Sequence, residues 1–341
     1  MLTFASGGWV LLLAVLLSLA AVAWVLAHGR HTIGDGRNPA TYGFDLSHTL
    51  VPRDQIVAAV AKDALEPLTD PHTVSVAEAQ AAGANQYRRY LLNNTRVIGV
   101  TINGDARCYP LPVMQLHEVC NDTVGGVPVL VTYNGLCDSV VVARREAGGQ
   151  VRTFGTSGLL YNSNLLLYDR QARNAEESLW SQLEWRAIAG PAAEARLTLT
   201  LLPCELVTWP HWRAEHPEGR VIVGVPELAG DYPMKRWQSY LSNPEIKFPV
   251  SPLWHDPAHA AKTPVAAVRS GGTWRVYLLD ELAALPADER ARALAASPVP
   301  LGFDASSATL CTAHPDTDTV YALLFAWYAM HPDQTHGHLV P

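Results

Sequence analysis

Charged residues are scarce in this chain, making up only 17% of its 341 residues. The net charge at pH 7 is −7, so the basic excess that nucleic-acid binding requires is missing. Nucleic acid is therefore excluded as an expected partner. Apolar residues make up 48% of the chain and include ten Trp, which predicts large buried surfaces and excludes a disordered chain.

Cysteine is scarce as well. The chain has five: Cys108, Cys120, Cys137, Cys204 and Cys311. So few, and an odd number, in so long a chain is not a disulfide framework. At least one thiol stays unpaired unless it bonds to another chain.

One segment near the N-terminus, Trp9 to Ala27, contains neither charge nor proline. A helix of about 19 residues spans close to the roughly 30 Å hydrocarbon core of a bilayer. Two interpretations compete: an uncleaved transmembrane anchor, and a signal segment cut after Ala27. We favour the anchor because the run is long for a signal peptide. The expected order is a tail at 1–8, the anchor or signal segment at 9–27 and a linker at 28–44.

The charges that flank this segment do not settle its orientation. Residues 1–8 carry no Lys or Arg, whereas Arg30 and Arg37 follow the run. The positive-inside rule alone would keep the body inside. Only two charges are involved, so the expectation of an extracytoplasmic, periplasmic body rests on the resemblance described below.

Local patterns predict several elements of the body. Three β-branched runs predict strands at Val97–Thr101, Val127–Thr132 and Val140–Ala143. Apolar residues at helical spacing predict a short helix at Asp54–Leu65.

The body also contains an internal repeat. The segment Val97–Leu111 matches Val265–Leu279 at a constant offset of 168, Val127-Pro128 matches Val299-Pro300, and Trp212–Pro217 matches Trp327–Pro332. Three matches in the same order predict two copies of a β-rich unit, each opening with a hairpin and closing with a short helix before His-Pro. We expect an α+β, β-rich fold with two related sheet units, the first at 45–250 and a shorter second at 251–341.

Three clusters in the first copy carry residues suited to chemistry. In Leu116–Asp122, four residues fall at helical spacing, with the first and third on one face: His117, Glu118, Asn121 and Asp122. His117 with a nearby carboxylate suits a general base, or a metal ligand held through its second nitrogen. A hydrogen-bonded structural histidine is the equally weighted alternative.

The second cluster, Thr132–Ser139, is a Gly-containing turn after a strand that includes Cys137, with Tyr133 and Ser139 as candidate substrate-binding residues. Backbone N–H groups in such a turn can lower a thiol pKa, and Cys137 with His117 would make a Cys/His pair. An inert buried thiol is the alternative.

The third cluster is a polar block inside an apolar stretch, Phe154–Arg170, followed by Ser178–Gln182. It offers a substrate-binding wall made of Tyr161, Asn162, Asn164, Asp169 and Trp180, or a network that satisfies itself.

Six segments together are familiar as a pattern: VIGVTINGDARCYPL, LHEVCNDTVGGVPVLVTY, FGTSGLLYNSNLLLYDR, SLWSQL, AIAGP and ELVTWPHWRAEHP. From Leu46 to His331 the chain resembles the bacterial and archaeal family known as domain of unknown function 3179. The resemblance implies a protein exported or anchored outside the cytoplasm. It implies no reaction.

The chain departs from that family at the cysteine turn. The family pattern reads T-Y-C-P-L-C-G-S, a Cys-x-x-Cys, whereas Asn134, Gly135 and Asp138 stand here in place of Cys, Pro and Gly. A dithiol or a two-thiolate metal site at this turn would need Cys120 or Cys108 as the second thiol.

Three functions remain open from the sequence. The first is a thiol-based enzyme or redox protein with Cys137, His117, Glu118 and Asp122 as catalytic residues. The second is a copper or zinc site with His117, Cys120 and Cys137 as ligands. The third is a non-catalytic binding or scaffold subunit, with the membrane and an envelope protein as partners.

Overall fold

The computed structural model describes residues 9–10, 12–18, 33–83, 91–228, 230–232, 237–311, 317–335 and 339–340. The chain divides into two compact units, residues 1–33 and 34–341. In the first unit, residues 9–10 and 12–18 are helical, while residues 11 and 19–27 of the predicted span lie outside the described residues. Within the described ranges, no helix combines the length and the apolar character that a membrane crossing requires.

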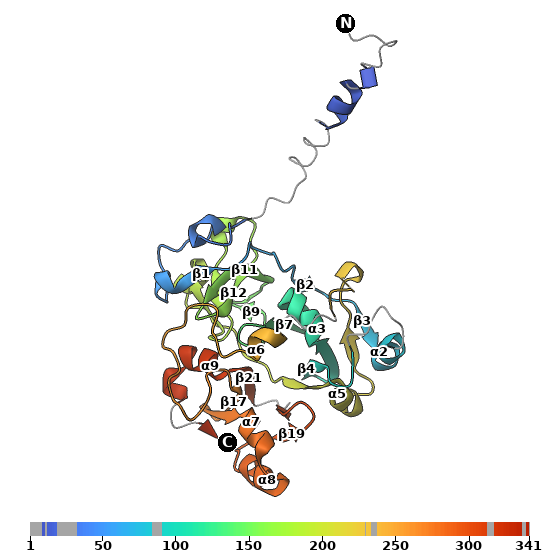
Figure 1. Ribbon diagram of the computed structural model, residues 1–341, viewed down its shortest axis with the longest axis vertical. Coiled ribbons are helices and arrows are strands. Elements are labelled where there is room, and N and C mark those ends of the chain that lie inside the picture. Colours follow the sequence, from blue (N-terminus) through green and yellow to red (C-terminus); the bar gives the residue numbers. More distant parts are fainter. Residues whose placement is uncertain are drawn as a thin grey trace. The chain divides into compact units, whose positions relative to one another are not determined.

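The second unit, which we call the body, is β-rich with short helices, and its strands form three main sheets (Figure 1). The central sheet has eight strands, in the order β2 (Leu68–Thr69), β6 (Val119–Val124), β7 (Val127–Asn134), β8 (Ser139–Arg144), β21 (Asp318–Leu323), β17 (Pro264–Ser270), β18 (Thr273–Leu278) and β22 (Leu339–Val340). A five-stranded sheet has the order β15 (Glu205–Thr208), β4 (Arg96–Ile102), β5 (Asp105–Pro110), β16 (Arg220–Ile222) and β3 (Thr73–Ser75). A second five-stranded sheet has the order β1 (Ile56–Ala58), β11 (Phe154–Tyr161), β12 (Asn164–Asp169), β13 (Leu179–Ser181) and β14 (Arg186–Ala189).

Two small hairpins and a set of short helices complete the body. The hairpins are β9 (Glu146–Ala147) with β10 (Gln150–Val151), and β19 (Gly302–Asp304) with β20 (Thr309–Cys311). The α-helices are α2 (Val76–Gly83), α3 (Leu111–His117), α4 (Pro191–Glu194), α5 (Trp209–Glu215), α6 (Gln238–Leu241), α7 (Leu279–Ala284), α8 (Ala287–Ala295) and α9 (Leu324–Met330). The 3₁₀ turns are η2 (Pro39–Tyr42), η3 (Arg53–Gln55), η5 (Asn174–Glu176), η6 (Pro226–Leu228) and η7 (Pro332–Gln334).

The three sheets stack as layers with hydrophobic clusters between them. On one face of the central sheet, Leu130 packs in a cluster with Phe154 of the β11 sheet. On the other face, Val131 packs in a cluster with Ile98 of the β4 sheet. Both faces of the central sheet are therefore covered, which explains why β7 and β8 have long runs of buried apolar residues.

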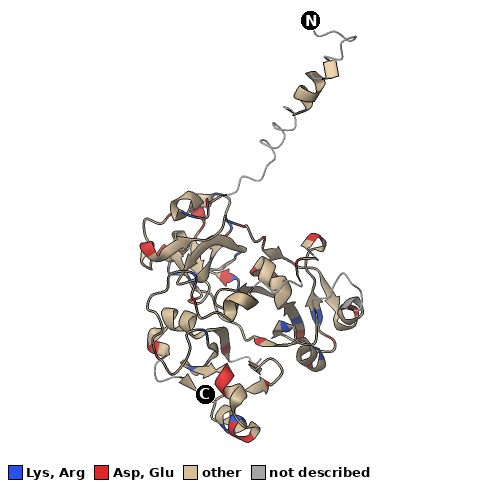
Figure 2. Cartoon of the chain, viewed as in Figure 1, with Lys and Arg blue, Asp and Glu red and all other residues tan. Residues whose placement is uncertain are grey.

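Several charged side chains buried in the body are paired, while the buried Arg145 donates to the carbonyls of Asp122 and Arg152. Buried ion pairs join Arg107 to Asp122, Lys62 to Glu177 and Arg152 to Asp169. An unpaired charge in this environment would be costly, because burial removes its hydration. Figure 2 shows basic and acidic residues interspersed through the body, with both signs together on α8.

Two of the three predicted repeat matches occupy equivalent places in the structure, whereas Val127-Pro128 begins β7 and Val299-Pro300 lies in no strand. The strand order β15-β4-β5-β16 in the first half has the same form as β21-β17-β18-β22 in the second. In each set the first three strands are antiparallel neighbours, and the fourth pairs in parallel with the third. In the hairpins, Ile98 pairs with Tyr109, and Ala266 pairs with Tyr277, so the register keeps the offset of 168.

The helices that close the two copies also occupy equivalent places. Helices α5 and α9 follow β15 and β21, and each ends just before a His-Pro pair. Trp212 packs on His216 with ring centroids 5.0 Å apart, and Trp327 packs on His331 at 4.3 Å. The two Trp residues and the two His residues are each 115 positions apart, as are the strand partners in β15 and β21.

The two halves meet inside the central sheet. Val140 of β8 pairs with Tyr321 of β21, and the Leu323 N–H donates a hydrogen bond to the Cys137 carbonyl at 2.8 Å. In a reciprocal contact, the Thr309 hydroxyl of β20 donates to the Leu206 carbonyl of β15. The halves therefore share both a sheet and its two hydrophobic clusters.

The three strand predictions are confirmed by β4, β7 and β8. The helix predicted at Asp54–Leu65 is wrong, because Arg53–Gln55 forms a 3₁₀ turn and Ile56–Ala58 forms β1. Ile56 and Val57 are β-branched and pair with Tyr161 and Leu160 of β11, so edge pairing overrides a weak helical pattern.

The shared sheet predicts that the first half cannot fold alone. A fragment of residues 45–250 would expose the edge of β8 and open both clusters, so we expect it to lose cooperative unfolding in urea, monitored by Trp fluorescence. The matched control is the body, residues 34–341, which should unfold in one transition. A fragment that unfolds cooperatively would contradict the shared core.

Candidate functional site

Cys137 lies in the four-residue turn between β7 and β8, and an ion pair holds this turn in place. Asp138 has a left-handed backbone, with φ of 42°, which a non-glycine residue adopts at some cost. Its carboxylate accepts two hydrogen bonds from Arg96, at 2.7 and 2.8 Å, and one from the Tyr133 hydroxyl at 2.8 Å. These three bonds keep the turn in one conformation.

The Cys137 thiol is fully buried. Its Sγ donates to the Ser163 carbonyl at 3.4 Å, and its N–H donates to Asn134 Oδ1 at 3.3 Å. Burial raises the pKa of the Cys137 thiol, and the nearby carboxyl of Glu118 raises it further. The thiol is therefore protonated at neutral pH, in contrast to the lowered pKa that the turn alone suggested.

A segment around α6 lies over this turn. A Cβ at Gly135 would come within 2.0 Å of the Trp237 ring nitrogen, so only glycine permits this approach. Tyr240 stacks edge to face with Trp237, and the Lys262 ammonium lies 3.4 Å from the centroid of the Tyr240 ring. The turn is therefore covered by aromatic rings.

Beside Cys137, four buried side chains form a hydrogen-bond network that leaves Asn164 Oδ1 without a partner among the described residues. Ser139 donates to Gln182 Oε1 at 2.7 Å, and the Asn164 amide donates to the same oxygen at 2.8 Å. The Gln182 amide in turn donates to the Thr132 hydroxyl at 2.9 Å. The donors and acceptors mostly satisfy one another, which is the structural alternative expected for this block.

The helical prediction for Leu116–Asp122 is wrong. Helix α3 ends at His117, Glu118 adopts a left-handed backbone with φ of 56°, and Val119 begins strand β6. The β6 strand pairs with β7 over its whole length, so residues 117 and 121 do not share a helix face. Tertiary pairing overrides the local spacing here.

Glu118 is a buried carboxyl next to the cysteine turn. Its Oε1 accepts a hydrogen bond from the Asn134 amide at 3.3 Å, and Asn134 also accepts from the Cys137 N–H. Burial raises the pKa of Glu118 to about 8. Glu118 is therefore largely protonated at neutral pH.

His117 faces a different set of partners. Its Nδ1 lies 2.6 Å from the Glu66 carbonyl oxygen and its Nε2 lies 2.9 Å from the Tyr232 hydroxyl. Burial lowers the pKa of His117. Both ring nitrogens are occupied, so neither is left to take a proton from Cys137.

The residues predicted as metal ligands are not brought together. Cys120 packs in the cluster between the central sheet and the β4 sheet, whereas Cys137 packs in the cluster on the opposite face. Among the described residues, no three His, Cys, Asp or Glu side chains lie so as to hold a metal ion. The proposed copper or zinc site of His117, Cys120 and Cys137 has no assembled ligand set there. Cys108 packs in a third cluster, so neither cysteine supplies a second thiol at the turn.

The remaining predicted residues have structural partners. Asp122 accepts from Arg107 and Tyr109, and Asp169 pairs with Arg152. Asn162 reaches across to the other half of the body.

The aromatic members of the predicted wall lie in two different clusters. Tyr161 packs in the cluster on the outer face of its sheet. Trp180 packs against Phe154 in the cluster that holds Cys137. Ser139 and Asn164 therefore lie in the network beside Cys137, and Trp180 shares its hydrophobic cluster. Tyr133 packs on the opposite face and reaches the turn through Asp138, and Glu118 is linked through Asn134. His117, Asp122, Tyr161 and Asp169 have their partners elsewhere.

A second cysteine cluster was missed in the sequence. The Cys311 Sγ lies 3.6 Å from His211 Nε2, and His211 Nδ1 lies 4.0 Å from Asp304 Oδ1. Burial raises the pKa of Cys311 to about 12, with Glu205 adding to the effect. Burial alone would raise the pKa of Asp304, but hydrogen bonds led by those from Ser306 lower it. Cys311 and His211 are 100 residues apart in the chain and meet because β20 lies against β15. No local sequence pattern therefore predicts this cluster.

The geometry defines a class of protein: a β-rich, layered body whose halves share a sheet, with a buried thiol at the joint. The chain belongs to the family described as protein of unknown function (DUF3179), whose family model matches residues 62–316. Comparison with curated proteins and with solved structures gives no match.

The raised pKa of Glu118 predicts a pH dependence of stability. The folded state holds the Glu118 proton up to about pH 8, whereas the unfolded chain releases it near 4.5. Stability from this group is full below the unfolded pKa and is lost as pH rises toward 8. We expect Glu118→Gln to remove about 2–4 kcal/mol of the fall in unfolding free energy between pH 5 and pH 8.

Urea unfolding at the two pH values measures this difference. The exposed Glu146→Gln serves as the matched control and should leave the fall unchanged. An equal fall in the wild type and in Glu118→Gln would show that Glu118 ionises normally in the folded protein.

Proposed function

We propose that this chain is a non-catalytic binding or scaffold protein of the cell envelope, in which the polar cluster at Cys137 is structural. The observation that carries the proposal is the state of Cys137: a fully buried, protonated thiol whose hydrogen is directed at the Ser163 carbonyl. A nucleophile needs access and a base, and His117, the expected base, is engaged elsewhere.

In this proposal the two halves are copies of one unit, and the turn at Cys137 joins them. The equal strand orders and registers support a duplication. The Leu323 N–H of the second copy bonds to the Cys137 carbonyl, so the ion pair and network around the turn stabilise the joint. Loss of the first cysteine of the family's turn is consistent with such a role.

The envelope location rests on the sequence. The uncharged run from Trp9 to Ala27 has the length of a membrane anchor, and members of the matched family are expected outside the cytoplasm. In this proposal the N-terminal helix holds the body on the periplasmic face, next to an envelope protein partner.

Thiol chemistry remains a second candidate, moved from Cys137 to Cys311. Cysteine nucleophiles use a thiol that lies next to an imidazole, which in turn lies next to a carboxylate. Cys311 is also the one partly exposed cysteine of the five. Against it stands the raised pKa of the thiol, since burial, and after it the nearby carboxylates, disfavour a thiolate.

Alkylation of the folded protein separates the two candidates. We expect iodoacetamide at pH 7.5, followed by peptide mass spectrometry, to modify Cys137 only after unfolding in urea. Cys311 should react slowly in the folded protein, and His211→Gln should not change its rate if it has no catalytic role.

His255→Gln is the matched control, since His255 is an exposed histidine that lies outside the cluster of Cys311, His211 and Asp304. Faster alkylation of Cys311 than of an unfolded cysteine, slowed at least tenfold only by His211→Gln, would favour thiol chemistry. Rapid alkylation of Cys137 in the folded state would contradict the structural role proposed for it.

The anchor has its own test. In a Gram-negative host, the full chain should sediment with membranes, and deletion of residues 9–27 behind an added cleavable signal sequence should release the body into the periplasm. Protease added to spheroplasts should digest the anchored body. A body protected until the spheroplasts are lysed would reverse the orientation.

A further inference from the structure

One face of the β4–β5 hairpin holds an arginine and a tyrosine that bind carboxylates of the chain itself. Arg107 donates to Asp122 Oδ2 at 3.0 Å and to Asp105 Oδ2 at 3.2 Å. The Tyr109 hydroxyl donates to Asp122 Oδ2 at 2.7 Å. The first half thus contains a complete carboxylate site that is filled from within.

The equivalent face of the β17–β18 hairpin keeps the binding residues and lacks the acids. Arg275 and Tyr277 stand 168 positions after Arg107 and Tyr109, in the same register. Thr273 stands in place of Asp105, and α8 with the segment that follows it stands in place of strand β6. Within the described part of the chain, Arg275 makes no ion pair and donates only to the Ala296 carbonyl, at 2.7 Å.

The tyrosine differs more strongly between the two halves. Tyr277 is fully buried, yet its hydroxyl has no hydrogen-bond partner among the described residues. A buried hydroxyl without a partner is costly and unusual in a folded protein. In the first half the equivalent hydroxyl donates to the carboxylate of Asp122, so a carboxylate is a group that would suit Tyr277.

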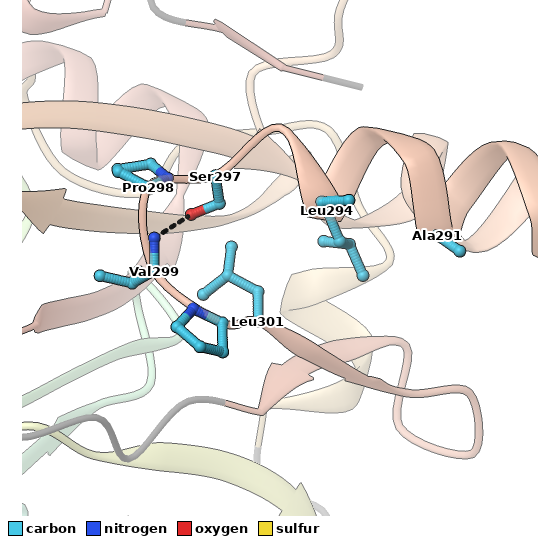
Figure 3. Close-up of a pocket in the computed structure, with 8 residues that line it drawn as sticks. Ala291, Leu294, Ser297, Pro298, Val299 and Leu301 are labelled. Atoms are coloured by element: carbon cyan, nitrogen blue, oxygen red, sulfur yellow. Dashed lines mark hydrogen bonds between the residues drawn. The ribbon is translucent and has the colours of Figure 1, made fainter.

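A cavity lies where that carboxylate would bind. Its volume is about 240 Å³, and its lining includes Arg275, Tyr277, Thr273, Ser270, Ser297 and Pro298. An arginine and several hydroxyls around a space of this size suit a small anion that accepts hydrogen bonds. A second hollow, of about 540 Å³ beside α8, shares Ser297 and Pro298 but has an otherwise apolar lining of Leu294, Val299 and Leu301 (Figure 3).

We propose that the second half binds a small organic carboxylate in the cavity between β17–β18 and Ser297. One carboxylate oxygen accepts from the Tyr277 hydroxyl, and Arg275 supplies the positive charge, as their counterparts do for Asp122. The proposal is independent of the roles assigned to Cys137 and Cys311, because none of its residues belongs to either cluster.

Saturation-transfer-difference NMR on the full chain in detergent tests the proposal, with acetate and succinate as probes. We expect saturable binding that Arg275→Gln weakens at least tenfold and Tyr277→Phe about tenfold. Thr273→Asp restores the acid that Asp105 provides in the first half. Arg107 holds Asp105 and Asp122 together there, so the new carboxylate should weaken probe binding by repulsion without blocking the site. Thr273 is exposed, so this variant is expected to fold.

Two controls keep the result specific. Tyr109→Phe removes the equivalent hydroxyl from the first half and should leave probe affinity unchanged, and Gln150→Glu adds a negative charge on another hairpin with the same expectation. No saturable binding to the wild type, or binding that Arg275→Gln leaves intact, would overturn the proposal. Sulfate that competes as strongly as succinate would overturn the carboxylate class.

Discussion

The hydrogen bond from the Leu323 N–H to the Cys137 carbonyl joins the halves of the body, and much of the remaining structure depends on that contact. It extends the pairing of β8 with β21, through which four strands of the second half continue the sheet begun by the first. The turn that carries Cys137 must therefore keep one conformation. Its left-handed Asp138, the bonds from Arg96 and Tyr133, and the fit of Gly135 against Trp237 all serve this requirement.

This constraint accounts for the chemistry of the cluster at the joint. A thiol that lies under aromatic rings and between two hydrophobic layers loses its hydration, so burial raises its pKa and keeps it neutral. The same burial keeps Glu118 protonated, and a protonated carboxyl beside Asn134 avoids placing a charge at the joint. The polar residues around Cys137 stabilise the contact between the halves. The cavity lined by Arg275 lies in the second half, away from this cluster.

The sequence predicted the parts of the fold that depend on local or repeated patterns. Its β-branched runs located β4, β7 and β8, and the offset of 168 between Val97 and Val265 reproduced the register of two hairpins. The sequence-based predictions failed where pairing between distant segments determines the local structure. Glu118 ends α3 in a left-handed conformation because β6 must pair with β7, and the contact of Cys311 with His211 exists only because β20 lies against β15. The sequence also did not show on which face of the sheet a buried residue packs. Cys120 and Cys137 lie on opposite faces of one sheet.

Hydrogen exchange at the Leu323 amide tests the shared joint most directly. This N–H is bonded across the boundary between the halves, so a single cooperative body requires complete unfolding before it exchanges. The account predicts that the free energy of opening at Leu323 equals the free energy of global unfolding. Exchange at a clearly lower free energy, while amides within β7 and β8 stay protected, would show that the halves open separately and would contradict the account.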